Sequence, residues 1–350
     1  MIWLRAECKK FERRTPLTPQ AASQLINRGI QVYVEKSPTR IFPDDEYCSA
    51  GCELVEGGSW KQAPLDAYIL GLKELPSDQT PLVHKHIYFA HAYKGQSDAR
   101  EILSRFHEGG GEIYDLEFLT DEKGRRVSAF GHWAGFVGTA LSIDFFYQQQ
   151  KSDTYPSLKD FSSQESLLEQ IRYKQSSCSV HPRVILIGAL GRCGRGAVEM
   201  AEKLQLEVTK WDYEETKRGG PFEEIAEHEI FINTVLLSSK IPPFIDRKTL
   251  NKGHRLRVIG DVSCDPSSPY NPIPLYDHVS NWKDPFISVV DVKNPLDILA
   301  VDNLPSLLPK ESSEDFSQQL LPHLQNFLEN RNNPVWQRSR EHFAKNIEAL

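Results

Sequence analysis

The sequence has no apolar run long enough to cross a lipid bilayer. Its longest apolar stretch, from about Val184 to Leu190, is far shorter than the roughly 20 residues of a membrane-spanning helix. The N-terminus also lacks the charged and then apolar pattern of a secretory signal. We therefore expect a cytoplasmic protein without a membrane partner.

Positive charge and paired cysteines are also scarce. Lysine and arginine number 41 against 48 acidic residues, which gives a net charge of −7 and does not favour a nucleic acid as partner. The six cysteines show no Cys-x-x-Cys spacing and no matching histidine pairs. We expect no metal site, and we expect Cys48 and Cys52, the nearest pair, to be packed thiols.

What is present is an ordinary globular composition with alternating strand and helix patterns. The chain has 350 residues, of which 39% are hydrophobic and 25% charged, which suits two packed domains. A helix pattern opens at Thr18 and Pro19. Strand patterns surround it and follow it, at residues 2–5, 30–35, 67–72, 87–91 and 112–116. This alternation predicts an α/β fold with mostly parallel sheets, in which two Rossmann-like domains are doubly wound.

The tail of the chain predicts a discontinuous first domain. Residues 313–350 return to helical spacing, and in two-lobed proteins of this class the last helix often crosses back to the first lobe. We predict a first domain of residues 1–129 with 308–350, and a second domain of residues 130–307. Near the junction we expect a hairpin of residues 116–119 with 126–130, a helix over residues 133–150 and an exposed loop at residues 148–164.

A glycine-rich turn follows the buried strand pattern of residues 184–187. Gly188, Gly191 and Gly194 are spaced Gly-x-x-Gly-x-x-Gly, and a helix pattern covers residues 197–204. Glycines let the backbone turn tightly, and they let a pyrophosphate approach the amides at a helix N-terminus. The sequence therefore predicts a dinucleotide site in the second domain, with a glycine turn that binds no ligand as the alternative.

An acidic residue follows at the spacing expected for an adenosine ribose. The next strand pattern ends at Asp212, whose carboxylate can accept hydrogen bonds from the ribose diol. A carboxylate there would repel the 2′-phosphate of NADP, so we expect NAD as the cofactor. Lys217 and Arg218 weaken this preference, because basic residues can tolerate a phosphate.

Charged residues crowd the loop after the first strand pattern. Arg5, Lys9, Arg13 and Arg14 make this loop locally positive in an acidic chain. Guanidinium groups bind carboxylates through two hydrogen bonds, so the loop suits a substrate with more than one carboxylate. A solvated loop of mixed charge is the alternative.

Lys73 and His91 stand at the ends of two further strand patterns. Parallel strands present their carboxyl ends at one sheet edge, where ligands bind. A partly desolvated lysine can serve as a general base, and a histidine can serve as an acid. Either residue alone is more often an ordinary surface or core residue, but their joint placement favours catalysis.

Together these segments resemble the lysine-forming, NAD-dependent saccharopine dehydrogenases, which share a superfamily with alanine dehydrogenase and the transhydrogenase nucleotide-binding subunit. The resemblance extends over nearly the whole chain. The element from Glu7 to Arg14 and the pair Lys73 and His91 occur in alanine dehydrogenases too. Residues 115–118, 124–127 and 305–309 favour the saccharopine enzymes.

The resemblance implies an oxidoreductase that converts saccharopine with NAD and water to L-lysine and 2-oxoglutarate, a reaction of lysine biosynthesis. Lys73 would accept the proton of the secondary amine, and His91 would act as acid and base while the imine is hydrolysed. The first domain would then be the substrate-binding, catalytic one and the second the NAD-binding one, with the active site in a cleft between them. We expect small molecules as partners and a monomer, with a homo-oligomer as the alternative.

The resemblance also implies binding residues. Arg14 and Phe130 fall where the family binds substrate, next to Lys9 of the basic loop, while Glu74 and Glu117 would hold Lys73 and tune the local charge. The residues implied for NAD are Arg125, Gly188, Gly191, Arg192, Cys193, Gly194, Asp212, Thr216, Val262, Asp302, Asn303 and Leu304. Thr234 stands where fungal relatives carry a cysteine, so we expect no redox partner for Cys193.

Two other functions stay open at this point. One is another amino-acid or opine-type NAD dehydrogenase of the alanine dehydrogenase superfamily, with a different amine or keto acid as its substrate. The other is a nucleotide-binding regulator without catalysis. The presence of Lys73, His91 and Arg14 together disfavours the regulator.

Overall fold

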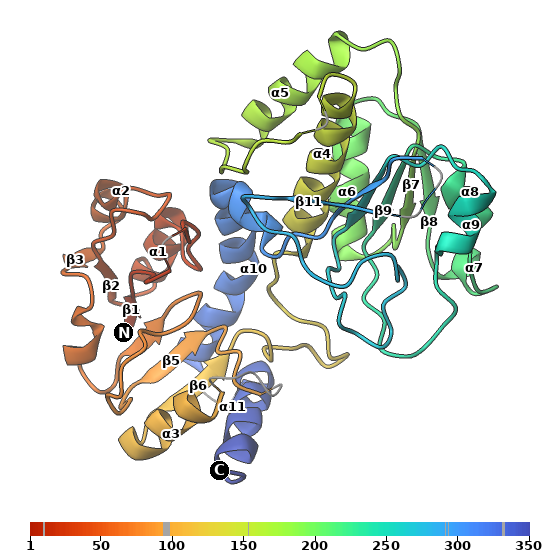
Figure 1. The fold of residues 1–350 in the computed structure, drawn as a ribbon. Coiled ribbons are helices and arrows are strands. Elements are labelled where there is room, and N and C mark those ends of the chain that lie inside the picture. Colours follow the sequence, from red (N-terminus) through yellow and green to blue (C-terminus); the bar gives the residue numbers. More distant parts are fainter. Residues whose placement is uncertain (10, 94–98, 153, 291, 293, 331–332) are drawn as a thin grey trace. The chain divides into compact units, whose positions relative to one another are not determined.

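The computed structural model describes residues 1–350 except residues 10, 94–98, 153, 291, 293 and 331–332. The chain divides into two compact units, one of residues 1–129 with 309–350 and one of residues 130–308 (Figure 1). Each unit has a six-stranded sheet of its own. Within the described ranges, no helix is both long and apolar enough to cross a membrane.

The sheet of the first unit has parallel strands in the order β3-β2-β1-β4-β5-β6. Its strands are β1 (Ile2–Leu4), β2 (Val32–Glu35), β3 (Glu53–Val55), β4 (Tyr68–Leu70), β5 (Lys85–Tyr88) and β6 (Glu112–Asp115). The winding direction reverses between β1 and β4. In open α/β sheets, ligands bind at such a reversal, outside the carboxyl ends of the strands.

The helices of the first unit come from both of its chain segments. They are α1 (Pro19–Ile26), α2 (Asp44–Ser49), η1 (Ser59–Gln62), α3 (Ala99–Gly109), α10 (Pro309–Glu329) and α11 (Pro334–Ile347). The Thr18 side chain caps α1 as predicted, because it accepts a hydrogen bond from the Ala21 amide at 3.3 Å. Trp336 of α11 is fully buried and stacks on Phe327 of α10, with ring centroids 4.3 Å apart. The C-terminal helices therefore belong to the core of the first unit.

The sheet of the second unit has the order β11-β12-β10-β9-β7-β8. Its strands are β7 (Val184–Ile187), β8 (Val208–Trp211), β9 (Ile230–Asn233), β10 (Val258–Asp261), β11 (Phe286–Ser288) and β12 (Asp297–Leu299). They run parallel, except for β11 at the edge, which is antiparallel to β12. The winding reverses between β7 and β9, so the loops that follow these two strands are the place for a ligand in this unit.

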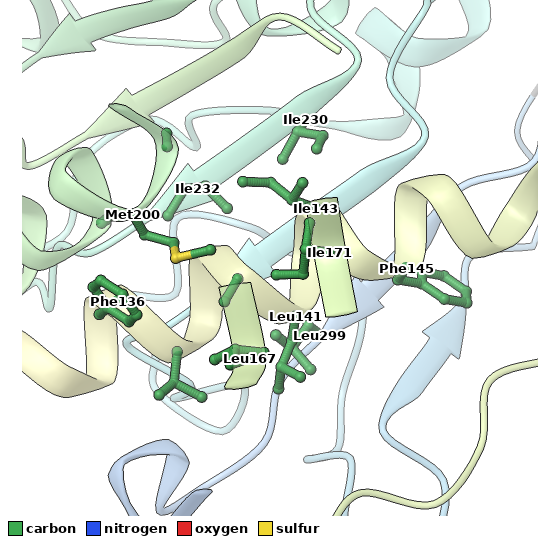
Figure 2. Close-up of a cluster of buried hydrophobic side chains, with 14 of the residues drawn as sticks. Phe136, Leu141, Ile143, Phe145, Leu167, Ile171, Met200, Ile230, Ile232 and Leu299 are labelled. Atoms are coloured by element: carbon green, nitrogen blue, oxygen red, sulfur yellow. The ribbon is translucent and has the colours of Figure 1, made fainter. Parts of the chain in front are cut away.

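Helices cover both faces of this second sheet. They are α4 (Gly131–Gln149), α5 (Gln164–Ser176), α6 (Arg192–Lys203), α7 (Tyr213–Thr216), α8 (Glu223–Ala226), α9 (Arg247–Lys252) and η2 (Leu304–Leu307). Alternate side chains of β7 point to opposite faces: Val184 and Leu186 join the core beneath α4, α5 and α6, part of which Figure 2 shows, and Ile185 and Ile187 join a second core. Buried strands covered on both faces confirm the α/β fold that the sequence predicts.

Glycines let α4 and α6 pack closely against each other. A Cβ atom at Gly196 of α6 would overlap the carbonyl oxygen of His132 in α4, and a Cβ atom at Gly135 of α4 would overlap the carbonyl oxygen of Cys193. Each helix therefore presents a glycine to the backbone of the other. Phe136 of α4 and Met200 of α6 lie buried in the core beside this contact (Figure 2).

Some local predictions differ from the structure. The turn at residues 121–124 is present, but the expected hairpin around it is reduced to a single bridge between Thr120 and Arg126. α5 was not predicted, because its sequence is mostly polar and its capping box, a reciprocal pair of Ser163 and Ser166, is made of serines rather than the usual acid. α6 begins at Arg192 instead of residue 197, so Gly194 lies inside the helix.

His86 in β5 gives the first unit a pH-dependent stability. Its ring is fully buried against Trp60 and Phe106, and among the residues described here neither ring nitrogen has a hydrogen-bond partner. Burial lowers the pKa of His86 well below its ordinary value of about 6.5. The unfolded chain binds a proton near that ordinary value and the folded chain does not. Stability is therefore lost as the pH falls below about 6.5, by up to ~1.4 kcal/mol per pH unit.

Replacement of His86 by leucine should flatten this dependence. We expect the urea midpoint of the variant to change less between pH 7 and pH 5 than that of the wild type. His107→Leu serves as the control, because His107 lies on the exposed side of α3 in the same unit and its replacement should leave the slope unchanged. Equal slopes for His86→Leu and wild type would show that His86 is not the group responsible.

Candidate active site

The loops after β1 and β4 meet at the reversal of the first sheet. The loop after β1 begins at Arg5, and the loop after β4 contains Gly71 and Lys73. The Glu7 carboxylate joins them, since it accepts hydrogen bonds from the backbone amides of Leu72 at 2.7 Å and Lys73 at 2.9 Å. The predicted catalytic lysine thus lies at the place where the fold favours a ligand.

Arg5 is part of this junction and is not the exposed cation that the sequence suggests. It is 2% exposed, its guanidinium pairs with the Glu7 carboxylate at 3.4 Å, and it donates a hydrogen bond to the Lys73 carbonyl. Burial raises the pKa of Glu7, although Arg5 and the two backbone amides act in the opposite direction. Arg5 is therefore used inside the protein, and Arg14, a second of the four predicted cations, is buried as well.

Acidic residues lie around Lys73. Burial opposes the ionisation of Glu12, but Arg14 and then Lys73 outweigh it, and the pKa of Glu12 lies below its ordinary value. The pKa of Glu74 is lowered as well, because hydrogen bonding and the charges of Lys9 and Lys73 outweigh burial. Two ionised carboxylates thus lie within electrostatic reach of the Lys73 amine.

Arg14 and Lys9, the predicted substrate-binding cations, have different surroundings. The Arg14 side chain is buried and forms a two-pronged pair with Glu12, at 2.8 Å for Nε to Oε1 and 2.7 Å for Nη2 to Oε2. Lys9 is half exposed, and its amine lies 3.4 Å from the Glu74 carboxylate. The Nε and Nη2 edge of Arg14 is therefore occupied by a carboxylate of the protein itself, whereas Lys9 can change partner.

His91 follows β5 after a short connection, because the strand ends at Tyr88 rather than at residue 91. Its backbone adopts a left-handed conformation with φ of 51°, which is uncommon for a residue other than glycine and is often found at functional sites. The ring lies nearly parallel to that of Phe89, with centroids 6.4 Å apart. His91 and Glu74 border a cavity of about 320 Å3 that Tyr88 and Arg105 also line.

The two remaining predicted substrate residues, Glu117 and Phe130, lie between β6 and α4 in the sequence. Glu117 follows β6 and forms an ion pair with Arg126 at 3.6 Å. Its backbone amide donates to Asp115, which is fully buried. Phe130 is partly buried and precedes α4 as its N-cap. The structure thus ties Glu117 to Arg126, and the proposed contact of Glu117 with Lys73 stays a prediction.

The glycine turn of the second unit has the shape that a dinucleotide needs. Gly188 has φ of 94°, and Gly191 is the N-cap of α6, which leaves the positive end of the helix dipole at the turn. A Cβ atom at Gly194 would overlap the Gly188 carbonyl, so only glycine allows the turn to fold back on the helix. Both features fit the pyrophosphate of a dinucleotide.

Asp212 is fixed at the carboxyl end of β8. One carboxylate oxygen accepts a hydrogen bond from the Leu190 amide of the glycine turn, and the other accepts one from the Tyr213 amide, both at 2.8 Å. A carboxylate has about four lone-pair sites, so it can accept further bonds from a ribose diol while it keeps these two. The carboxylate thus lies directly against the glycine turn, as a ribose-binding acid must.

The remaining residues implied for NAD are spread over several loops. Thr216 ends α7 and donates to the Asp212 carbonyl at 2.8 Å. Arg125 belongs to the first unit, where it is exposed and pairs with Asp121 at 2.8 Å. The others are residues at or near the carboxyl ends of strands and at the starts of helices in the second unit, namely Arg192, Val262, Asp302, Asn303 and Leu304. For all of these, contact with NAD stays a prediction.

A buried polar network was missed by sequence reasoning. Asp261 at the end of β10 accepts hydrogen bonds from Asn233 at 2.9 Å, Ser263 at 2.7 Å and Tyr276 at 2.6 Å. Val262, implied for NAD, lies between two members of this network, and its amide donates to the Asn233 carbonyl. The sequence does hold a signal for this network, because Asn233 and Asp261 are the polar residues with which the apolar strands β9 and β10 end.

Cys193 is a free thiol in the first turn of α6. Burial raises the pKa of Cys193 to about 12, and Asp261 acts in the same direction. The thiol is therefore protonated at neutral pH and is a poor nucleophile.

Comparison with known proteins places these features in a family. Residues 3–137 match the family model described as alanine dehydrogenase/PNT, N-terminal domain. The chain is 46% identical to saccharopine dehydrogenase (NAD(+), L-lysine-forming) of Yarrowia lipolytica, covering 99% of this chain and 97% of the relative. It is 44% identical to the enzyme of the same name from Schizosaccharomyces pombe, with 100% and 99% covered. This chain belongs to the lysine-forming saccharopine dehydrogenase family.

A solved structure shares the fold. A transhydrogenase from Sinorhizobium meliloti matches with a TM-score of 0.67 at 18% identity, over 97% of each chain. At this identity the likeness concerns the fold alone, and it agrees with the Rossmann-like, doubly wound units described above.

Proposed function

We propose that this protein is an NAD-dependent oxidoreductase that acts on the CH–NH group of saccharopine and yields L-lysine and 2-oxoglutarate. The observation that carries the proposal is the full-length match at 46% identity to a relative whose name states this reaction and this cofactor. Lys73, His91 and Arg14 are all present, which disfavours a nucleotide-binding regulator without catalysis.

We assign the proton transfers of this reaction to Lys73 and His91. Bound NAD supplies the acceptor for a hydride from the carbon next to the secondary amine. As that hydride leaves, Lys73 accepts the proton of the amine and a C=N bond forms. His91 removes a proton from the water that adds to the imine carbon and returns it to the nitrogen, which gives the carbinolamine. His91 then takes the hydroxyl proton as the C=O bond of 2-oxoglutarate forms and gives it to the nitrogen as the C–N bond breaks, so that lysine departs as an amine.

Substrate recognition is proposed for the charged loop after β1. Arg14 is buried and held by Glu12, and Lys9 is half exposed, so that its amine can turn to a carboxylate. Saccharopine carries several carboxylates, so cations of this kind suit it. We assign Phe130 to the same subsite and Glu74 and Glu117 to the control of charge near Lys73. The first unit is then the substrate-binding one and the second the NAD-binding one, and the cleft expected between them stays a prediction.

The preference for NAD rests on the charges beside Asp212. The two basic residues that follow Asp212 in sequence are paired with acids: Lys217 pairs with Glu214, and Arg218 pairs with Glu224 at 2.5 Å and lies over the Trp211 ring. Lys210, which lines the same pocket as Asp212, pairs with Glu202. The carboxylate of Asp212 is thus the charge next to the ribose in this proposal, and it disfavours NADP.

Replacement of Asp212 by alanine should raise the KM for NAD by about tenfold to a hundredfold, because charge-assisted hydrogen bonds of this kind are worth ~1.5–3 kcal/mol. Asp212→Asn is the matched variant, since asparagine can still cap α7. Both variants should use NADP better than the wild type does, which distinguishes lost recognition from local damage. Equal use of NAD and NADP by the wild type would contradict the assignment.

The reaction itself is tested by the absorbance of reduced nicotinamide. We expect turnover with NAD and saccharopine, and the reverse with lysine, 2-oxoglutarate and NADH, but none with alanine and NAD. Turnover with alanine or another opine in place of saccharopine would keep the chemistry of Lys73 and His91 and change the substrate. Tight NADH binding without turnover of any pair would favour the regulator.

We also propose that the protein acts in the cytoplasm as a monomer, with small molecules rather than nucleic acids or membranes as partners. The net charge of −7 supports this view of its partners. Cell fractionation and light scattering of the purified protein test the compartment and the mass.

A further inference from the structure

Two buried charged residues attach the loop after β1 to the backbone of Lys73. Arg5 and Glu7 have side-chain exposures of 1% and 7% and lie 3.4 Å apart. Glu7 accepts hydrogen bonds from the amides of Leu72 and Lys73, and Arg5 donates to the Lys73 carbonyl. The peptide groups on both sides of Lys73 are therefore held by side chains, in a segment that belongs to no helix or strand.

Gly71 shows that the loop is built around Arg5. A Cβ atom on Gly71 would overlap the Arg5 guanidinium, so the guanidinium occupies the space that any other residue at position 71 would fill. The same guanidinium lies 5.8 Å from the centroid of the Tyr88 ring in β5. Arg5 is thus enclosed by β4, β5 and the loop that carries Lys73.

We propose that Arg5 and Glu7 are positioning residues, which fix the backbone of Lys73 so that its amine keeps one direction during catalysis. The inference rests on the proposed function, in which Lys73 is the base, and it adds two residues that contact no substrate.

Energetics favour this role over a purely structural one. A buried ion pair contributes little net stability, because the loss of hydration of both charges offsets their attraction, and apolar side chains of similar size often serve as well. Its hydrogen bonds, however, fix direction. A displacement of about 1 Å in a catalytic group can lower a rate by about a hundredfold.

The first test compares Arg5→Lys and Glu7→Gln with Arg40→Lys. Lysine at position 5 loses the forked geometry, and glutamine at position 7 turns an NH2 group toward a backbone amide. Arg40 is the matched control, since it is a buried arginine of the same unit that donates to the Glu35 carbonyl. We expect kcat to fall by about tenfold or more in the two test variants, with the KM values for saccharopine and NAD within about twofold of wild type. Arg40→Lys should lose comparable thermal stability and keep its kcat.

Two further readouts do not require turnover. Methyl acetimidate labelling of lysines, followed by peptide mass mapping, should show Lys73 reacting at least threefold faster in both test variants, with Lys36 and Lys252 unchanged. In the wild type, hydrogen exchange should show the amides of Leu72 and Lys73 protected although they lie outside the strands. The exchange measurement remains available if the variants fail to fold.

These outcomes separate the two proposals. Absence of saccharopine turnover in the wild type would overturn the proposed function, while labelling and exchange would still decide the role of Arg5 and Glu7. The positioning role is overturned if Lys73 labelling and kcat in Arg5→Lys and Glu7→Gln match those of Arg40→Lys. It is also overturned if the amides of Leu72 and Lys73 in the wild type exchange as fast as solvated loop amides.

Discussion

Replacement of Lys73 by methionine is expected to lower kcat for saccharopine oxidation by about 10²- to 10⁴-fold, because the variant has no group at this position that can accept the proton of the secondary amine. Methionine keeps most of the length of the side chain, and the backbone contacts with Arg5 and Glu7 do not depend on the amine. The variant should therefore fold and bind NADH as the wild type does. Steady-state rates over a range of pH, with NADH fluorescence titration, measure both effects.

His91→Gln is the companion variant, and a loss of the same order is expected for it. Lys36→Met and His107→Gln are suitable controls, because Lys36 forms an exposed ion pair with Glu56 and His107 lies on the exposed side of α3. Both controls should keep wild-type kcat. If Lys73→Met and His91→Gln each kept wild-type turnover while folding normally, the acid and base assignment would be wrong.

Replacement of Gly196 by alanine is expected to destabilise the second unit by about 3 kcal/mol or more, since overpacking of a close contact displaces backbone as well as side chains. The added methyl group would overlap the His132 carbonyl, so α4 and α6 must separate and the core around Phe136 and Met200 must open. The thermal midpoint and the urea midpoint, followed by circular dichroism, measure the loss. NAD affinity should fall as well, because α6 begins in the glycine turn.

Gly131→Ala provides the control for this effect. Gly131 is the first residue of α4, and the nearest atoms to an added Cβ are side-chain carbons of Arg192 at 3.4 Å and beyond, which is ordinary contact distance. Alanine also favours a helix over glycine, so this variant should be as stable as the wild type. Equal midpoints for Gly196→Ala and Gly131→Ala would show that the close approach of α4 and α6 is not needed.

Much of the fold could be predicted from local sequence. Thr18 and Pro19 start α1 where their capping chemistry predicts, and the apolar run of β7 becomes a strand buried on both faces. The hairpin expected around residues 121–124 is reduced to one bridge between Thr120 and Arg126, because β-propensity depends on the packing that the rest of the fold supplies. α5 shows the opposite case, since Leu167, Leu168 and Ile171 form a buried stripe within a segment whose average composition is polar.

The candidate site was predictable in its residue types more than in its contacts. Lys73, His91 and Asp212 follow strands, so the topology brings each to a carboxyl edge. The prediction that Arg5 belongs to a positive substrate site was wrong, because the buried space that Arg5 occupies is created by Gly71, which lies 66 positions away. A charge pattern cannot show whether a guanidinium faces solvent or a neighbouring carbonyl. For the same reason the sequence did not predict that the Glu7 carboxylate accepts hydrogen bonds from two backbone amides.

The return of the chain to the first unit has a consequence during synthesis on the ribosome. Residues 130–308 form a contiguous unit and can fold once they have emerged. The first unit cannot reach its final packing by then, because β6 still lacks α11, and Trp336, which packs against Tyr114 and Phe327, is made only after residues 130–308. Residues 1–129 thus leave the ribosome before the second unit but complete their packing after it, and the loss of α11 would damage strands that were made long before it.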